Sequence, residues 1–267
     1  MSNIHRTVIR VVEKEYLSPN FLRITLQGDD IAPYQEVPLG VNNKIFIPPK
    51  GHTAVEMPIF NEETRLWEME NEANRPTVRT YTHRLIDLEK GLLTMDFAVH
   101  EGDSIACDWA MNAPIGSEIG VAMKLNHREL YPEVDNYLFV TDMTGIPVVS
   151  AILETLPETA NVSVIAEILD QSDEVPEHFS TRANLTLEWV HNPTPDQGST
   201  LSERAINLAK PLHLTDSRFV HVTAEYATVR AIRDHLRNDH AWEARDLFAC
   251  SYWQIGKREN EPREKRI

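Results

Sequence analysis

The stretch of sequence that decides the fold reads RTYTHR and runs from Arg79 to Arg84. It alternates permanent cations, one aromatic ring and short hydroxyl side chains, and it reads as a β-strand that ends at the polar turn 87–91. Side chains alternate between the faces of a strand, so odd-numbered residues are expected on one face and even-numbered ones on the other. Arg79 could then hold a pyrophosphate through its planar fork of donors while Tyr81 stacks beside an attached ring system. An edge strand that simply faces water would carry the same pattern, and the pattern alone leaves both interpretations open.

Outward from this stretch, the first half of the chain is a series of short alternating segments separated by turns, with no convincing helical stretch before Asp142. Alternation of apolar and polar residues over short runs is typical of strands with one buried face. The predicted strands are 7–12, 21–26, 44–47, 78–84, 92–100 and 117–122. Many short strands at this spacing predict a closed or nearly closed antiparallel barrel. The polar, proline-bearing stretch 48–74 is predicted to be a long surface excursion.

The period of the apolar residues changes after the segment 126–132. Helical spacing runs from Ile146 to Leu156, covers part of a helix at 205–208, and returns from Val229 to Leu236. Alternating strands and helices predict a parallel sheet with helices on its faces. The fold class is therefore β + α/β, with an antiparallel β-barrel at residues 1–130 and a Rossmann-like α/β domain with a charged tail at residues 131–267. The predicted strands of the second half are 136–141, 161–168, 185–190, 218–223 and 246–252.

The composition is that of an acidic globular protein. Of its 267 residues, 41 are Asp or Glu and 26 are Lys or Arg, which gives a formal charge of −15. A nucleic-acid partner is not expected, because phosphate backbones are bound by basic surfaces. No apolar run is long enough to cross a bilayer and no secretory pattern opens the chain, so we expect no membrane insertion and a cytoplasmic location. Cys107 and Cys250 are too few for a disulfide framework or a thiolate-rich metal site.

RTYTHR resembles the Arg-x-Tyr-Thr-x-Arg signature of the siderophore-interacting proteins, a flavin-binding branch of the ferredoxin-reductase superfamily. Three further segments resemble the same family in the same order. The strand 96–100, DFAVH, is similar to its Asp-Phe-Val-x-His, and 107–110, CDWA, stands where the family has Ser or Thr, a variable residue and Trp-Ala. The segment 252–256, YWQIG, is similar to its closing Gly-Tyr-Trp-x-x-Gly. The loop 102–106 departs from the family, because GDSIA replaces Gly-x-x-Gly-Pro-Ala.

The resemblance implies a ferredoxin-reductase-like fold whose barrel binds FAD. A flavin needs its diphosphate neutralised and its ring held, while the protein tunes how readily the ring accepts electrons. By resemblance, Arg79 holds the pyrophosphate, Tyr81 lies on the isoalloxazine and Thr82 approaches its redox-active nitrogen. Trp109 is expected to open a short helix whose N-terminal amides can meet phosphate, and it also fits a core aromatic residue. The flavin-binding set is Arg79, Thr80, Tyr81, Thr82, Asp96, Val99, His100, Cys107, Trp109, Ala110 and Trp253.

The α/β half is expected to receive the nicotinamide of NAD(P)H at the carboxyl ends of its strands. No G-x-G-x-x-G is present. Thr144 in the turn 141–145 can cap a helix, and Ala224 replaces a glycine that relatives usually carry, which narrows the approach of a dinucleotide. Both turns also fit ordinary strand-to-helix connections, and the choice between NADH, NADPH and reduced ferredoxin stays open. The predicted nucleotide-binding residues are Asp142, Thr144, Ala224 and Glu225.

The family acts on ferric siderophores, whose complexes are commonly anionic, and reduces the iron so that it can be released. The chelator supplies the oxygen ligands of the iron, so no metal ligands are predicted in the protein. Cations are needed instead, to hold a bulky chelate near the flavin edge. Lys44 resembles a lysine in the family's His-Val-Lys-x-x-Phe strand and leads the predicted substrate-binding set. That set is Lys44, Lys124, Arg128, Arg245 and Lys257.

Other enzyme chemistries have little support in this chain. Its eleven histidines form no HExxH, and Gly-x-Ser-x-Gly is absent, so neither zinc-protease nor serine-hydrolase chemistry is expected. The sequence predicts an FAD-dependent ferric-siderophore reductase that takes electrons from NAD(P)H or ferredoxin. Two alternatives stay open: a general NAD(P)H-flavin oxidoreductase with another acceptor, and a non-catalytic protein that only binds a ferric chelate.

Overall fold

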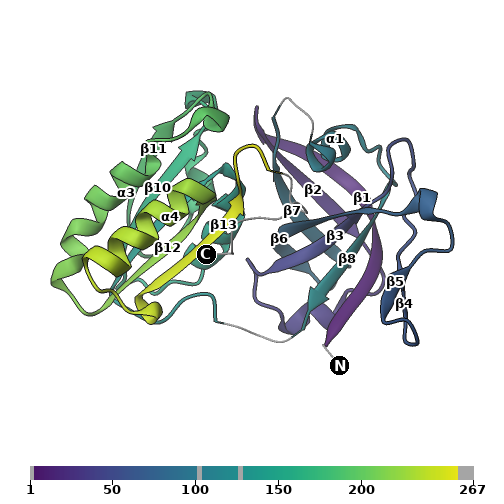
Figure 1. Ribbon diagram of the computed structural model, residues 1–267, viewed down its shortest axis with the longest axis horizontal. Helices are drawn as coiled ribbons and strands as arrows, with labels where there is room; N and C mark the ends of the chain where they lie inside the picture. Colours follow the sequence, from purple (N-terminus) through teal and green to yellow (C-terminus); the bar gives the residue numbers. More distant parts are fainter. Residues whose placement is uncertain (1–2, 101–103, 126–128, 258–267) are drawn as a thin grey trace. The chain divides into compact units, whose positions relative to one another are not determined.

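The chain folds into two compact units, Met1–Arg128 and Glu129–Ile267 (Figure 1). The structure is a computed structural model that describes residues 3–100, 104–125 and 129–257. No helix within these ranges is both long and apolar enough to cross a lipid bilayer.

The first unit is a closed barrel in which every neighbouring pair of strands is antiparallel. Its strands follow the order β1-β2-β7-β6-β3-β8, and the inward side chains, such as Leu22, Met95 and Val121, are fully buried. The predicted antiparallel barrel is confirmed. The strands are β1 (Ile4–Ser18), β2 (Phe21–Gln27), β3 (Asn42–Ile47), β6 (Thr77–Asp87), β7 (Leu92–Ala98) and β8 (Glu118–Lys124).

Two elements of this unit were not predicted from periodicity. The excursion 48–74 holds a two-stranded hairpin of β4 (Ile59–Asn61) and β5 (Leu66–Glu68), set apart from the barrel strands (Figure 1). These strands are three residues long and mostly exposed, so they show no alternation of buried and exposed positions. Helix α1 (Ile105–Asn112) spans little more than two turns, too short for a helical period to be read.

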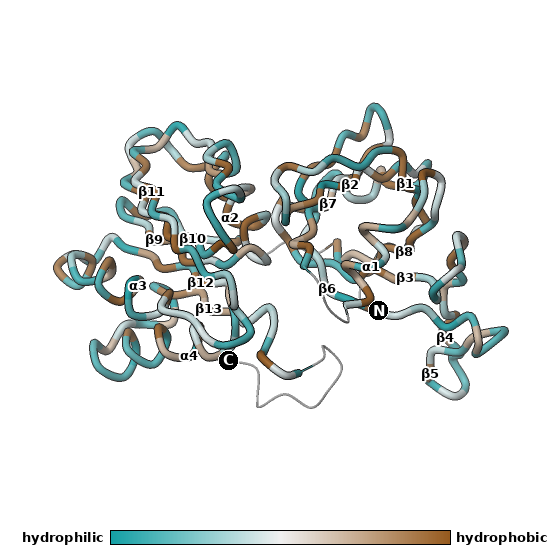
Figure 2. The backbone as a smooth tube through the Cα atoms, turned by 90° about the horizontal axis from the view of Figure 1, so that it is seen from above, coloured by the Kyte–Doolittle hydropathy of each residue, from teal (hydrophilic) through white to brown (hydrophobic). Residues whose placement is uncertain are grey.

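The second unit is a parallel sheet with helices on both faces, which confirms the predicted α/β half. The strand order is β11-β10-β9-β12-β13. α3 and α4 pack together over one face (Figure 1), and α2 lies on the other (Figure 2). The strands are β9 (Asn136–Asp142), β10 (Asn161–Ile168), β11 (Asn184–His191), β12 (Arg218–Glu225) and β13 (Leu247–Trp253), and the helices are α2 (Ile146–Leu153), α3 (Leu201–Ala209) and α4 (Tyr226–Asp234).

The order of these strands creates a topological switch point. The chain leaves β9 for β10 on one side, and later returns to place β12 on the other side of β9. In open α/β sheets, ligands bind where the strand order reverses, outside the carboxyl ends of the strands. Here that edge is formed by the ends of β9 and β12, Asp142 and Glu225.

Candidate functional site

The RTYTHR stretch forms the middle of β6, with no residue of it turned wholly to solvent. Arg79 pairs with the fully buried Ile45 on the neighbouring strand β3, so the odd-numbered side chains of the stretch face inward. The Tyr81 ring packs on Phe97 at 4.5 Å between centroids, and Phe97 lies 6.1 Å from Trp109. The interpretation as a water-facing edge strand is therefore wrong, because β6 has β3 and β7 as hydrogen-bonded neighbours.

The end of the stretch is buried more deeply than its start. Thr82, His83 and Arg84 are at most 6% exposed, and a register shift in the pairing with β7 falls between His83 and Leu85. A bulge of this kind breaks the simple alternation of faces at Arg84. Burial lowers the pKa of His83 to about 4, so its imidazole is neutral at physiological pH, beside the side-chain amide of Asn43.

Asp96, predicted to contact the flavin, is engaged with Arg23. The guanidinium donates from Nε and Nη2 to the two carboxylate oxygens, both at 2.8 Å, and the Asp96 side chain is 1% exposed. This bidentate pair joins β2 to β7, in which Arg23 and Asp96 are directly opposite each other. The aspartate thereby fixes the position of Arg23, and its role toward FAD stays a prediction.

Helix α1 begins earlier than predicted. Ser104 is its N-cap and accepts a hydrogen bond from the Cys107 amide at 3.3 Å, so Trp109 and Ala110 lie inside the helix and do not open it. Burial raises the pKa of the Cys107 thiol, but hydrogen bonds with His100 and Ser104 outweigh burial and leave that pKa below its ordinary value. The Cys107 thiol also donates to the carbonyl of Ala98 at 3.2 Å. This thiol holds α1 against the end of β7.

Other flavin-set residues lie around this helix. Val99 is buried, and its amide donates to the carbonyl of Asn20 at 2.9 Å, while His100 is exposed. The indole Nε1 of Trp109 is buried and has no hydrogen-bond partner within the described ranges. A buried N–H of this kind is costly unless an acceptor arrives, and a phosphate or ribose oxygen of FAD is such an acceptor. The donor set of the barrel therefore fits FAD.

Two predicted substrate-binding lysines lie on one outer face of the barrel. Lys44 stands opposite both Thr80 on β6 and Ala122 on β8, and its ammonium donates to the Thr80 hydroxyl. Lys124 follows Ala122 by two residues and so points to the same face. Arg245 and Lys257 are exposed residues of the other unit, and Arg245 pairs with Glu243 at 3.1 Å. Arg128 lies outside the described residues.

The predicted nucleotide-binding residues all gather at the switch point of the α/β unit. The buried carboxylate of Asp142 accepts hydrogen bonds from the Thr144 amide at 2.9 Å, from the Thr144 hydroxyl at 2.5 Å and from the Trp253 indole at 2.7 Å. Burial raises the pKa of Asp142, and the Thr144 and Trp253 hydrogen bonds lower it in part. Trp253, predicted in the flavin set, thus pairs with the nucleotide set.

The start of α4 is capped by the protein itself. Glu225 accepts from the amides of Ala227 at 2.5 Å and Thr228 at 3.4 Å, and its other oxygen accepts from the Ile255 amide at 3.2 Å. Ala224 is buried at the end of β12. The first amides of α4, a place where phosphate often binds, are therefore occupied by the Glu225 carboxylate.

Glu167 lies near the end of β10. Burial raises the pKa of Glu167, and the charges of Asp142 and Glu225 raise it further.

Comparisons with known proteins agree with this arrangement. Residues 10–123 match the siderophore-interacting FAD-binding domain, and residues 134–256 match the siderophore-interacting protein family. The chain belongs to the siderophore-interacting protein family. It is 27% identical over 266 residues to ferric vibriobactin reductase ViuB of Vibrio cholerae, which covers 100% of this chain and 96% of that protein.

Further members and relatives support the assignment to the siderophore-interacting proteins. The NADPH-dependent ferric-chelate reductase of Escherichia coli is 26% identical over 251 residues, 92% of this chain and 91% of that protein. The crystal structure of a siderophore utilization protein from T. fusca superposes with a TM-score of 0.80 at 25% identity and covers 98% and 97% of the two chains. The siderophore-interacting protein SipS from Aeromonas hydrophila shares the fold, with a TM-score of 0.74 at 23% identity over 95% and 93%.

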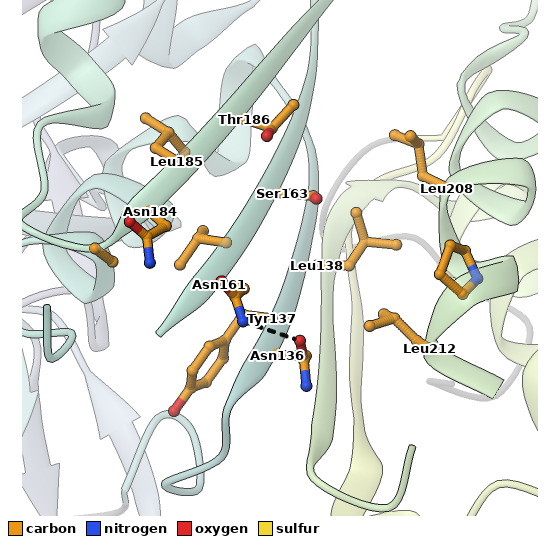
Figure 3. A pocket seen from close by; sticks show the side chains of 13 residues that line it. Asn136, Tyr137, Leu138, Asn161, Ser163, Asn184, Leu185, Thr186, Leu208 and Leu212 are labelled. Atoms are coloured by element: carbon orange, nitrogen blue, oxygen red, sulfur yellow. Dashed lines mark hydrogen bonds between the residues drawn. The ribbon is translucent and has the colours of Figure 1, made fainter. Parts of the chain in front are cut away.

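One pocket of this siderophore-interacting protein lies away from the predicted residues. It has a volume of about 620 Å³ and is found at the amino ends of β9, β10 and β11 (Figure 3). Asn136, Asn161 and Asn184 begin these three strands in register, and Asn161 donates to Asn136 at 3.4 Å. The strands run from this pocket toward Asp142 and Glu225, so it is not at the switch point.

Sequence spacing also missed a group of three histidines, His213, His235 and His240, whose nitrogen atoms lie within 4.8 Å of one another. The Nδ1 of His235 hydrogen-bonds Asp239 at 3.2 Å, as in many metal-bound histidines. The indole of Trp242 donates to the Nδ1 of His213 at 3.0 Å, which places the proton of the neutral ring on Nε2 and leaves no free lone pair. In this arrangement His213 cannot act as a metal ligand.

Proposed function

We propose that this protein reduces the iron of ferric siderophores, with FAD as its bound redox group and NAD(P)H as electron donor. The observation that carries the proposal is the RTYTHR strand, part-buried between two neighbours in a barrel whose sequence matches the siderophore-interacting FAD-binding domain. Similar proteins named ferric vibriobactin reductase and NADPH-dependent ferric-chelate reductase support the same reaction.

The protein's own residues bind and orient in this reaction. Bound FAD supplies the redox group that takes a hydride from a nicotinamide and passes electrons on one at a time. Since each ferric ion takes one electron, one NAD(P)H reduces two ferric chelates and yields one NAD(P)⁺, one proton and two ferrous ions. Arg79 would neutralise the pyrophosphate, Tyr81 and Trp109 would contact the flavin nucleotide, and Lys44 with Lys124 would attract the anionic chelate.

The electron donor would reach the switch point of the α/β unit. A dinucleotide there would have to place its phosphates away from the first amides of α4, because Glu225 already caps them. Ala224, in place of a glycine, further limits a close approach of the dinucleotide. Reduced ferredoxin is the alternative donor. We propose the cytoplasm as the compartment, since reduced pyridine nucleotides are regenerated there.

An anaerobic spectroscopic experiment tests this function. The purified protein should show flavin absorbance, bleach on addition of NADH or NADPH, and regain its colour when a ferric siderophore is added. Arg79→Ala should lose FAD, whereas Lys44→Ala should keep FAD and raise KM for the ferric chelate. A protein that cannot take up FAD, or a reduced flavin that ferric chelates leave reduced while quinones reoxidise it, would contradict the proposal.

A further inference from the structure

Arg6 on β1 is a cation that forms no ion pair with the residues that the structure describes. Its guanidinium carbon lies 4.4 Å from the centroid of the Trp67 ring and 5.4 Å from that of Phe46, and its Nη1 donates to the carbonyl of Pro58 at 2.7 Å. The Nη2 atom is buried and has no hydrogen-bond partner among residues 3–100, 104–125 and 129–257. Burial lowers the pKa of Arg6, which shows that its charge is partly withdrawn from water. An anion beside Nη2 would relieve this cost.

Arg6 lines a pocket of about 450 Å³. Its walls come from β1, from the segment before β4 and from the β4–β5 hairpin, including Val8, Met57, Phe60 and Trp67. The Phe60 and Trp67 rings lie 5.1 Å apart, and Trp67 is 50% exposed. A pocket with one cation and two aromatic rings in its walls, beside a third ring under the guanidinium, suits a flat ring that carries a negative oxygen.

The same cation is aligned with the predicted substrate lysine. Arg6 stands opposite Ala122 on one side of β8, and Lys44 stands opposite Ala122 on the other. Directly paired residues share a face, so the two cations and the Ala122 methyl form one row on the outside of the barrel. Adjacent strands are separated by about 4.8 Å, which puts the two Cα atoms about 10 Å apart. A bulky chelate can span this distance, whereas a single small anion cannot.

We propose that the pocket at Arg6 binds an aromatic ring bearing an acidic oxygen, such as a catecholate or an aryl carboxylate, and that it anchors the aryl arm of a ferric siderophore. The role as a siderophore anchor rests on the proposed function, whereas the binding of an aryl anion does not. The overall charge of the chain is −15, so an anion can bind only where cations are gathered locally. The walls of the pocket determine its selectivity. The Arg6 guanidinium favours a ligand with a negative charge, and the exposed rings of Trp67 and Phe60 favour an aromatic ligand.

Iron-free 2,3-dihydroxybenzoate is the first probe, measured by titration calorimetry on the FAD-loaded full chain. We expect saturable binding, and weaker binding of cyclohexanecarboxylate, which lacks the aromatic ring, and of benzyl alcohol, which lacks the charge. Arg6→Met should weaken 2,3-dihydroxybenzoate binding about 10- to 100-fold, the range for losing a hydrogen bond to a charged group. Arg10→Met is the matched control, since Arg10 lies on the same strand and face, pairs with Glu118 at 3.2 Å and lies outside the pocket.

Ferric substrates extend the test. Arg6→Met should raise KM for a ferric catecholate with kcat unchanged, and it should leave KM for a ferric hydroxamate unchanged. If Arg6→Met melts early, Arg6→Lys and Trp67→Leu decide, and both should weaken binding of the free aryl acid. Equal affinities in Arg6 and Arg10 variants, or no binding by the wild type, would overturn the proposal while leaving the reductase function standing. Aryl-acid binding without reduction of any ferric chelate would instead overturn the reductase function and the anchoring role.

Discussion

The ion pair of Arg23 and Asp96 offers the sharpest test of how strands β2 and β7 of the barrel are held together. Asp96 is 1% exposed at its side chain and Arg23 is 23% exposed, and two hydrogen bonds of 2.8 Å join them. Asp96→Asn keeps the shape, removes the charge and turns one acceptor into an amide donor that faces the guanidinium. Hydrogen bonds to charged groups contribute about 1.5–3 kcal/mol each, and breaking a buried pair costs about 3–5 kcal/mol. Because water can reach Arg23, we expect Asp96→Asn to lower the free energy of unfolding of the barrel by about 2–3 kcal/mol.

Hydrogen exchange of the β2 and β7 amides is the appropriate assay, since it reports opening of the barrel separately from the α/β unit. A double-mutant cycle with Arg23→Ala, Asp96→Ala and the double variant should give a coupling of about 2–3 kcal/mol. FAD affinity, measured by fluorescence, tells whether Asp96 contacts FAD directly or only positions Arg23. If Asp96 acts through Arg23, both single variants should weaken FAD binding equally. A loss of less than about 1 kcal/mol in the opening free energy of Asp96→Asn, or a coupling energy near zero, would refute the reasoning.

Three other changes probe the two units. Trp109→Phe removes the unpartnered indole N–H and should weaken FAD binding about tenfold in fluorescence titrations. Unchanged FAD affinity would contradict the contact. Gly145→Ala places a Cβ 2.6 Å from the Thr223 carbonyl oxygen and against the Thr141 hydroxyl. This overlap should lower the free energy of unfolding of the α/β unit by about 1–3 kcal/mol in urea titrations. An unfolding midpoint equal to that of the wild type would argue against close packing at Gly145. Burial raises the pKa of Glu167 above its unfolded value, so the folded unit binds more protons in the window between the two values, and its stability should fall as pH rises through that window. Glu167→Gln should flatten this slope in urea titrations between about pH 4 and about pH 8, and an unchanged slope would assign it to another group.

The barrel and the sheet could be predicted from the sequence because their signals are local. Alternation in β2, β6 and β8, and the change to helical spacing after Ile146, follow from which face of each element is buried. RTYTHR lies in a strand of this barrel, as predicted, and its role toward FAD stays a prediction. The start of α1 was misplaced because Ser104, a capping residue, was not used as a helix signal. The hairpin β4–β5 was missed because its side chains are mostly exposed.

The contacts that could not be predicted join residues far apart in the sequence. Arg6 and Lys44 both pair with Ala122, from β1 and from β3, and the register that aligns these three strands is not visible in any window of sequence. The engagement of Asp142 with Trp253 joins residues more than a hundred positions apart. Glu225 as a cap for α4 is different, because a glutamate at the end of an apolar strand, just before a helical period, could have suggested it.

Salt dependence can decide whether local cations or the net charge governs binding of an anionic chelate. The chain carries −15, which repels an anion at long range, while the proposed row of Lys44, Lys124 and Arg6 would attract it at short range. At physiological ionic strength the screening length is about 8 Å, so distant carboxylates are screened more strongly than a cation in contact. A charge pair at about 4 Å contributes about 1 kcal/mol in water and about 4 kcal/mol near a protein surface. We therefore expect chelate affinity to fall as salt is added above physiological strength, and to fall less in Lys44→Ala. Affinity that rises with salt would show that the net charge dominates, and the cation row would then not be the main source of binding.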